Sequence, residues 1–194
     1  MALTTACSST AYALNCAMYA MEHGDCDAAI VAGSQATTNP YTIIGLSKMG
    51  IRSPDGSSKS FDASANGYVG SDGFGSVVVK PLERAIADGD HIYCVIEGIT
   101  CNEDGARSPS LTTPSGEAQE EVLREVFKRT KINPHDIFFM EAHATGTAIG
   151  DPTEASVFGK VVGEGRSKDN PLRIGSVKSN IGHTEVVSFL AQLL

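Results

Sequence analysis

The chain has 194 residues and a formal net charge of −8. It is long enough to bury a core as one domain, and its negative charge argues against nucleic acid or an anionic membrane as the main partner. Five cysteines form an odd set without paired or zinc-type spacing, no signal-peptide pattern precedes them, and no apolar stretch is long enough to span a membrane. These features predict a soluble protein of the reducing cytoplasm without a bound metal.

The first element in chain order is a turn around Cys7, between a short strand-like lead-in and a helix predicted over residues 8–23. The unpaired N–H groups and the dipole at the start of a helix favour an anion, and therefore the thiolate form of Cys7. Cys7 is thus a candidate nucleophile for acyl chemistry. The alternative is a small buried cysteine, the commoner fate of a cysteine taken alone. The other four cysteines are predicted to be inert packing residues.

The next segments predict the interior of an α/β protein. The helix over 8–23 is apolar or small on nearly every face, and the apolar run 27–33 predicts a strand buried on both faces of a parallel sheet. Residues 40–67 are predicted to be rich in loops. The glycine-dense stretch 66–75 precedes a strand over 76–80. A dinucleotide-binding loop instead follows a strand and opens a helix, so this stretch does not predict such a loop. It therefore predicts closely packed backbone at the floor of an active site.

Strands and helices alternate in the second half as well, which indicates an α/β fold. A capping serine, Ser115, predicts an amphipathic helix over 116–131, and Asp151 is predicted to cap a helix running to about residue 162. The remaining predicted elements are a helix over 82–88, strands over 92–100, 137–142 and 172–177, a loop over 101–114, and a last helix from near Thr184.

Three reactive side chains follow predicted strands, namely Cys7, His143 and His183. Sites in α/β sheets assemble at strand ends, so these three side chains could converge. A single histidine in such a position is more often structural, whereas two of them in polar, glycine-containing turns favour a functional site. The spacing alone leaves both interpretations open.

Three motifs make the chain resemble the β-ketoacyl synthase family, and the ketosynthase domains of polyketide synthases in particular. They are Thr-Ala-Cys-Ser-Ser at residues 5–9, Glu-Ala-His-Ala-Thr-Gly-Thr with Gly-Asp-Pro-Thr-Glu at 141–154, and Gly-Ser-Val-Lys-Ser-Asn-Ile-Gly-His at 175–183. Segments 53–69 and 102–105 are also similar to that family. The resemblance covers essentially the whole chain, with the motifs in the family's order.

The resemblance implies a thiolase-like layered αβαβα fold and a decarboxylative Claisen condensation in polyketide or fatty-acid biosynthesis. Cys7 would take the acyl group from a thioester. His143 and His183 would bind the carbonyl of a malonyl thioester and stabilise the enolate that forms on loss of carbon dioxide. The protein would then be an acyltransferase.

Supporting roles are implied for several further residues. Lys178 would assist electrostatically, with Glu185 as its partner, and Thr145, Thr147 and Asn180 would contact the phosphopantetheine arm of an acyl carrier protein or carrier domain. Ordinary turn hydroxyls are the alternative for the two threonines. The resemblance implies no tightly bound cofactor, and a homodimer in the complete domain.

The chain departs from the family pattern in three places. Ala144 stands where the family usually has glycine, which is costly if that position needs a positive φ. Residues 70–73 read Gly-Ser-Asp-Gly where Arg-Gly-Glu-Gly is common, and 184–187 read Thr-Glu-Val-Val instead of the usual Leu-Glu and alanine run. None of these departures changes Cys7, His143 or His183.

The chain begins at the nucleophile turn and stops in the helix after His183, so residues 1–194 are predicted to be an internal fragment of a ketosynthase domain. Two other functions stay open. One is an inactive ketosynthase-like fragment or partner subunit. The other is a Cys/His thioester or peptide hydrolase, in which the second histidine would be surplus.

Overall fold

The computed structural model describes residues 1–110 and 112–194. Leu111, in the loop predicted over 101–114, lies outside the described residues. The chain divides into two compact units. The cysteine unit comprises Met1–Ala36, Asp72–Cys101 and Thr184–Leu194, and the histidine unit comprises Thr37–Ser71 and Asn102–His183. Each unit is described by itself.

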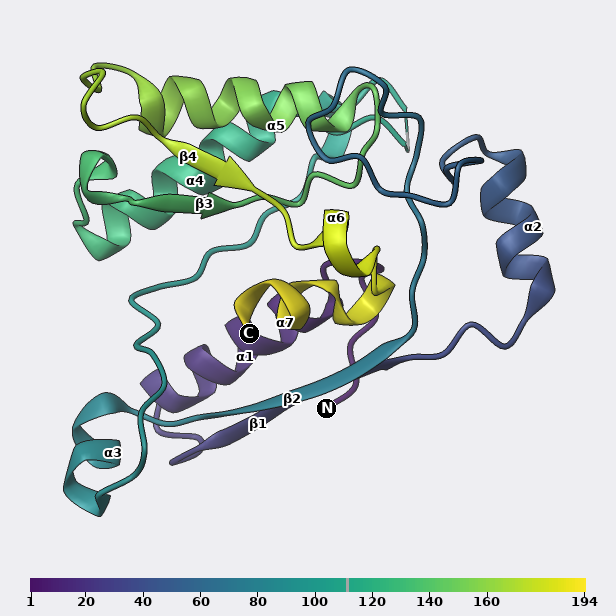
Figure 1. Cartoon of the computed structure of the whole chain (residues 1–194). Coiled ribbons are helices and arrows are strands. Elements are labelled where there is room, and N and C mark those ends of the chain that lie inside the picture. The colour runs from purple at the N-terminus through teal and green to yellow at the C-terminus, as the bar shows by residue number, and fades with distance from the viewer. Residues whose placement is uncertain (111) are drawn as a thin grey trace. The chain divides into compact units, whose positions relative to one another are not determined.

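The cysteine unit contains one antiparallel strand pair and its helices (Figure 1). Strands β1 and β2 pair from Ala29 opposite Val79 to Gln35 opposite Gly73. The elements are α1 (Ser9–Glu22), β1 (Ala29–Gln35), β2 (Gly73–Val79), α3 (Leu82–Asp88), the 3-10 turn η4 (Glu185–Val187) and α7 (Ser188–Leu193). The helix predicted over 82–88 is confirmed, and Gly89 ends it in the left-handed conformation with φ 72°.

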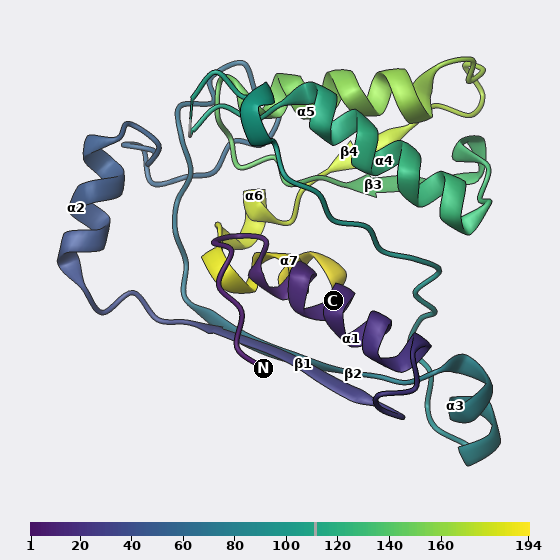
Figure 2. The ribbon, with the colours of Figure 1, turned by 180° about the vertical axis from the view of Figure 1, so that it is seen from behind.

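Helices α1 and α7 cover the same face of the β1–β2 pair, as both views show (Figures 1 and 2). Leu14, Val31, Val187 and Leu190 form the buried core there. The opposite face leaves large apolar side chains exposed, namely Ile30 (74%), Phe74 (89%) and Val78 (73%). The prediction that 27–33 is buried on both faces of a parallel sheet is therefore wrong. Its strand pairs antiparallel and is covered on one side, so alternate residues point outward.

The prediction of a strand over residues 92–100 is also wrong. Within the described residues this segment pairs with no strand, although Ile96 and Ile99 pack against the core. Ile92 and Tyr93 are exposed. Apolar content can place a segment against a core, but a strand also needs a neighbour for its backbone hydrogen bonds.

The histidine unit is built around a short parallel pair, in which Phe139 of β3 lies opposite Arg173 of β4. Its core consists of Ala142, Ala144 and Phe158, with Leu123 and Met140 packed against them. The elements are α2 (Pro40–Lys48), η1 (Gly105–Arg107), α4 (Gly116–Thr130), η2 (Pro134–Asp136), β3 (Phe139–Glu141), α5 (Gly150–Phe158), the π-helical turn η3 (Gly159–Gly163), β4 (Arg173–Gly175) and α6 (Lys178–Ile181). No helix of the described chain has both the length and the apolar content that crossing a membrane requires.

Helix starts show where the sequence was sufficient and where it was not. Ser115 caps α4, because its hydroxyl accepts the N–H of Ala118 at 3.2 Å, as predicted. Helix α2 lies in a region predicted to be loop. Its start was readable, since Asn39 accepts the N–H of Tyr41 at 3.0 Å and is followed by proline. The prediction of Asp151 as an N-cap is wrong, because α5 already begins at Gly150 and the Asp151 carboxylate binds elsewhere.

Candidate active site

Cys7 lies in the tight turn that leads into α1, in the cysteine unit. Ala6 has φ 55°, a left-handed conformation that is uncommon for a residue with a side chain. The N–H of Ser9 donates to the carbonyl oxygen of Ala6 at 3.1 Å, and the N–H of Thr5 donates to the Ser9 hydroxyl at 2.9 Å. The half-buried thiol thus precedes the first turn of α1, where the helix favours an anion.

The other cysteines differ in their surroundings. Cys94 is exposed, so the expectation that it packs inside an apolar segment is wrong, because residues 92–100 form no buried strand. Burial raises the pKa of the Cys101 thiol, and Cys16 nearby adds to the effect. A raised pKa lowers the thiolate fraction and therefore the reactivity of Cys101.

His143 follows β3 in a loop that two carboxylates of α5 hold by its backbone. Glu154 accepts the N–H groups of His143 and Ala144 at 2.7 and 2.8 Å. Asp151 accepts those of Gly146 and Thr147, each at 3.1 Å. Asp151 is 3% exposed, so this loop is fixed by a buried, charge-assisted set of hydrogen bonds.

The sequence showed Asp151 as a helix-start signal and both carboxylates within the motif at 141–154, but it did not show that they hold this loop. Asp151 also accepts the N–H of Phe61 at 2.8 Å, and the Ser60 hydroxyl donates to the Ala144 carbonyl at 2.6 Å. The signal for their role was the acidic pair following the histidine motif at a short interval. Burial raises the pKa of Glu154, against the opposing effect of the N–H groups it accepts.

Ala144 and the two threonines lie in the same loop. Ala144 has φ 23°, so the position does require a positive φ, as its usual glycine suggests. Thr145 is buried and Thr147 half-buried. The Thr147 hydroxyl accepts the N–H of Gly150 at 3.2 Å, which leaves its own proton available to a ligand.

His183 is held by the glycine-rich stretch. Its N–H donates to the Val69 carbonyl at 2.7 Å, and its carbonyl accepts the N–H of Ser71 at 2.9 Å. The N–H of Gly67 donates to the Gly146 carbonyl at 2.9 Å, in the loop that carries His143. Backbone of residues 67–71 therefore lies against both histidine loops, and its role as the floor of a site stays a prediction.

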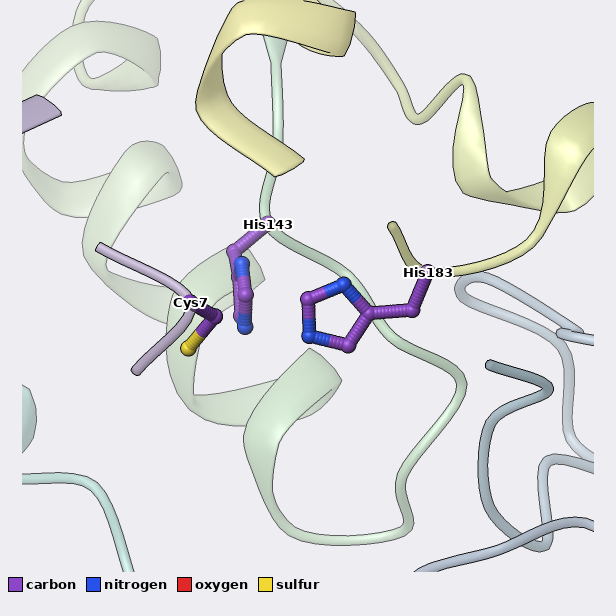
Figure 3. A group of neighbouring side chains, drawn as sticks. All are labelled: Cys7, His143 and His183. Atoms are coloured by element: carbon purple, nitrogen blue, oxygen red, sulfur yellow. The ribbon is translucent and has the colours of Figure 1, made fainter. Parts of the chain in front are cut away.

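The imidazoles of His143 and His183 meet edge to face, with ring centroids 5.3 Å apart and planes at 86° (Figure 3). Burial lowers the pKa of His183 to about 3, and His143, Lys178 and Arg52 add to the effect. Burial, followed by Lys178, lowers the pKa of His143 to about 4.

The two rings differ in their access to water. His183 is 3% exposed, whereas His143 keeps an accessible surface despite its dense surroundings. Because water that reaches a ring weakens desolvation, we regard the burial effect at His143 as the smaller of the two. Both imidazoles are neutral at pH 7 and each offers one N–H donor, an arrangement that suits a ligand oxygen.

The supporting residues fall in three settings. Lys178, the first residue of α6, is 2% exposed, and its charge lowers the pKa of both histidines. Asn180 lines a cavity of about 580 Å³ that neither histidine lines. Glu185 belongs to the cysteine unit, as does Cys7, which Figure 3 also draws.

Family models match nearly the whole chain. Residues 1–85 match the model described as "Beta-ketoacyl synthase, N-terminal domain", and 93–194 match "Beta-ketoacyl synthase, C-terminal domain". Similar curated proteins include the partially reducing polyketide synthase tpeA of Talaromyces stipitatus, 43% identical over all of this chain, and the highly reducing polyketide synthase alnA of Emericella nidulans, 45% identical over 98% of it. The chain spans 8% of the length of each.

Solved structures agree with this result. The ketosynthase from module 6 of the bacillaene synthase from Bacillus subtilis 168 is 38% identical, with a TM-score of 0.94 over 98% of this chain. The oxazolomycin ketosynthase domain OzmH KS7 of Streptomyces albus JA3453 is 36% identical, with a TM-score of 0.94 over the whole chain. This chain covers 34% of each. The predicted thiolase-like α/β fold is confirmed.

Proposed function

The chain belongs to the β-ketoacyl synthase family and corresponds to part of a polyketide synthase ketosynthase, and from this we propose that it takes part in a decarboxylative Claisen condensation. An acyl group on Cys7 would be joined to a malonyl-type carrier thioester, in polyketide or fatty-acid biosynthesis. The observation that carries the proposal is the edge-to-face contact of the His143 and His183 imidazoles, whose ring centroids lie 5.3 Å apart.

The first half-reaction loads Cys7. Its thiolate attacks the carbonyl carbon of the acyl thioester, a new C–S bond forms, and the carrier thiolate leaves and takes up a proton. The position of Cys7 before the first turn of α1 supports this role, because the helix stabilises the thiolate.

The second half-reaction forms the carbon–carbon bond. The bond between the malonyl carboxylate and its α-carbon breaks, carbon dioxide leaves, and the electron pair moves into an enolate whose oxygen accepts N–H donors from His143 and His183. The enolate carbon then attacks the acyl carbonyl on Cys7, and the Cys7 thiolate leaves. Buried Lys178 would favour the negative charge that develops on the oxygen, with Glu185 balancing its charge.

Carrier binding is assigned to polar groups near the histidines. Thr145 and Thr147 would offer hydroxyls to the phosphopantetheine arm, and Asn180 its amide. The Thr147 proton stays available because its oxygen already accepts the N–H of Gly150. The carrier protein or domain would thus be the partner, its phosphopantetheine arm would carry the substrate, and the complete domain would be a homodimer in the cytoplasm.

We further infer that residues 1–194 act as part of a longer ketosynthase domain and are inactive alone. The 34% coverage of solved ketosynthases supports this inference, as do the exposed Ile30, Phe74 and Val78 of the cysteine unit. Expression of the 194 residues alone should give poor solubility and no condensation. A cooperatively melting, active 194-residue chain would contradict it.

Substitutions in the full polypeptide that carries this chain test the division of roles. Cys7→Ala should abolish acyl transfer yet leave decarboxylation of the malonyl thioester measurable. His143→Ala or His183→Ala should slow decarboxylation by roughly two to three powers of ten, as expected for a lost oxyanion donor. Exposed His135→Ala is the matched control and should leave both steps unchanged. Undiminished decarboxylation in either active-site histidine variant would overturn the assignment.

A further inference from the structure

Two further side chains of the histidine unit, Tyr68 and Arg52, form a stack that ends on the His183 ring. The ring of Tyr68 meets the imidazole of His183 at an angle of 67°, with centroids 4.9 Å apart. The guanidinium carbon of Arg52 lies 4.9 Å from the centroid of the Tyr68 ring. Neither residue was identified in the sequence as part of the site.

The backbone fixes this stack in register. The N–H of Tyr68 donates to the Ile51 carbonyl at 3.0 Å, and the N–H of Ser53 donates to the Tyr68 carbonyl at 2.9 Å. The neighbouring Val69 carbonyl accepts the N–H of His183 at 2.7 Å. Segments around residues 52, 68 and 183 are therefore linked by hydrogen bonds as well as by their side chains.

The surroundings leave little freedom to the stacked side chains. Tyr68 is 7% and His183 3% exposed. A Cβ atom built on Gly70 would lie 1.9 Å from Nη1 of Arg52, so the guanidinium occupies the space that a side chain at position 70 would take. Gly70 is one of the departures from the family pattern, and its missing side chain makes room for Arg52.

We propose that Arg52 is a positioning residue that acts through Tyr68 to hold the imidazole of His183 in one orientation. A guanidinium over the face of an aromatic ring is attracted by the electrons of that ring, and a fixed ring limits how its neighbour can turn. The consequence for catalysis rests on the proposed function, because it requires His183 to donate to a substrate oxygen. A donor displaced by even a small distance loses much of its effect.

Electrostatics support the same arrangement. Charged and titratable groups of the histidine unit that contact the His183 ring or act on its pKa include His143, Lys178, Arg52 and Tyr68. The positive charge of Arg52 adds to the lowering of the His183 pKa, after burial, His143 and Lys178. Arg52 thus acts on His183 electrostatically in the same sense as burial, although burial is the larger effect.

Carbethoxylation of histidines by diethylpyrocarbonate tests the proposal without any substrate. The reagent attacks neutral imidazole, and at pH 7 His183 is neutral with or without Arg52, so the rate reports access and orientation. Peptide mass spectrometry of the full polypeptide would give the rate at His183 relative to exposed His135. We expect Arg52→Leu and Tyr68→Leu to raise this ratio by about fivefold or more, and Tyr68→Phe, which keeps the ring, to leave it within about twofold.

Arg173→Leu is the matched control, because its guanidinium carbon lies 4.5 Å from the Phe138 ring centroid in the same unit. It should not change the ratio. If Tyr68→Leu fails to fold, Arg52→Leu decides. An unchanged ratio in folded Arg52→Leu would overturn the proposal. A raised ratio in a polypeptide that never decarboxylates malonyl thioesters would uphold the positioning role and contradict the proposed function.

Discussion

In the cysteine unit, the turn around Cys7 is held by hydrogen bonds between residues three or four positions apart, whereas in the histidine unit the loop around His143 is held by bonds that span up to 90 positions. The first is a local structure that the sequence next to Cys7 specifies. The conformation of the loop around His143 is fixed only when Phe61, Asp151 and this loop have come together. The two turns that carry the candidate reactive groups are thus fixed in two ways, and we expect them to differ in their sensitivity to substitution.

The largest expected effect on stability is at Asp151. Asp151→Asn replaces one acceptor oxygen by an N–H₂ group facing the backbone donors of Gly146, Thr147 and Phe61. We expect a loss of about 3 kcal/mol in the free energy of unfolding, measured by urea titration. The exposed Asp62, which accepts only local bonds from Ser64, is the control, and Asp62→Asn should cost less than about 1 kcal/mol. Equal losses in the two variants would contradict the greater sensitivity that we infer for a loop held by long-range hydrogen bonds.

Gly146→Ala should be nearly as costly. The residue has φ 86°, and an added Cβ would meet the Lys59 nitrogen at 2.7 Å and the Gly67 carbonyl oxygen at 3.1 Å. Strain and overlap together predict a loss of about 2 to 3 kcal/mol. Gly45→Ala in α2, where a Cβ meets open space, should be neutral or stabilising. A tolerated Gly146→Ala would mean that the loop is less tightly fixed than its hydrogen bonds indicate.

Acidification should destabilise the histidine unit through His183. Its pKa falls from 6.5 to about 3 on folding, so the unfolded chain binds the proton more readily. The stability that comes from the neutral ring is fully present above pH 6.5 and is lost as the pH falls toward 3. Between pH 7 and pH 5 the loss is about 2 kcal/mol.

His183→Gln should remove that part of the pH dependence of urea unfolding, and exposed His135→Gln should not. Glu154 cannot account for such a loss, because its pKa is raised on folding. Its contribution is therefore present at low pH and is lost as the pH rises above 4.5. Parent and His183→Gln curves of the same slope would contradict the buried, neutral state of the ring.

The smallest predicted effect concerns the thiols. At pH 6.5 iodoacetamide should alkylate Cys7 about tenfold faster than Cys101, a difference of about 1.4 kcal/mol in barrier, because the helix favours the Cys7 thiolate and burial disfavours that of Cys101. Peptide mass spectrometry gives both rates in one sample. Exposed Cys94 controls for access alone and should react more slowly than Cys7. Faster labelling of Cys94 or Cys101 than of Cys7 would contradict the assignment of Cys7 as the nucleophile.

The sequence predicted much of what neighbouring residues decide, although the local start of α2 at Asn39 was missed, and it failed where distant residues decide. Gly89 caps the end of α3 and Ser115 caps the start of α4, and each of these capping signals acts within its own turn of helix. The role of Asp151 was missed because its partners include Phe61, far away in the chain, and a capping signal looks the same whichever donors the carboxylate finally meets. Residues 92–100 were read as a strand because apolar content does not reveal whether a pairing neighbour exists.

The same distinction applies to the candidate site. Three motifs predicted that Cys7, His143 and His183 are the reactive residues, and these roles stay predictions. The stack of Arg52 and Tyr68 on His183 was not predicted, because no pattern near either residue points to a histidine more than a hundred positions away. Positioning residues of this kind are visible only in three dimensions.

Product analysis tests the central claim most directly. The full polypeptide would be supplied with an acyl thioester and a carrier-bound malonyl thioester labelled with ¹³C at its α-carbon, and the carrier-bound products would be identified by mass spectrometry. The account predicts a β-ketoacyl product that carries the label at the new carbon–carbon bond, released carbon dioxide, and no such product from Cys7→Ala. Free acyl acid without any new carbon–carbon bond would identify a thioester hydrolase and contradict the account.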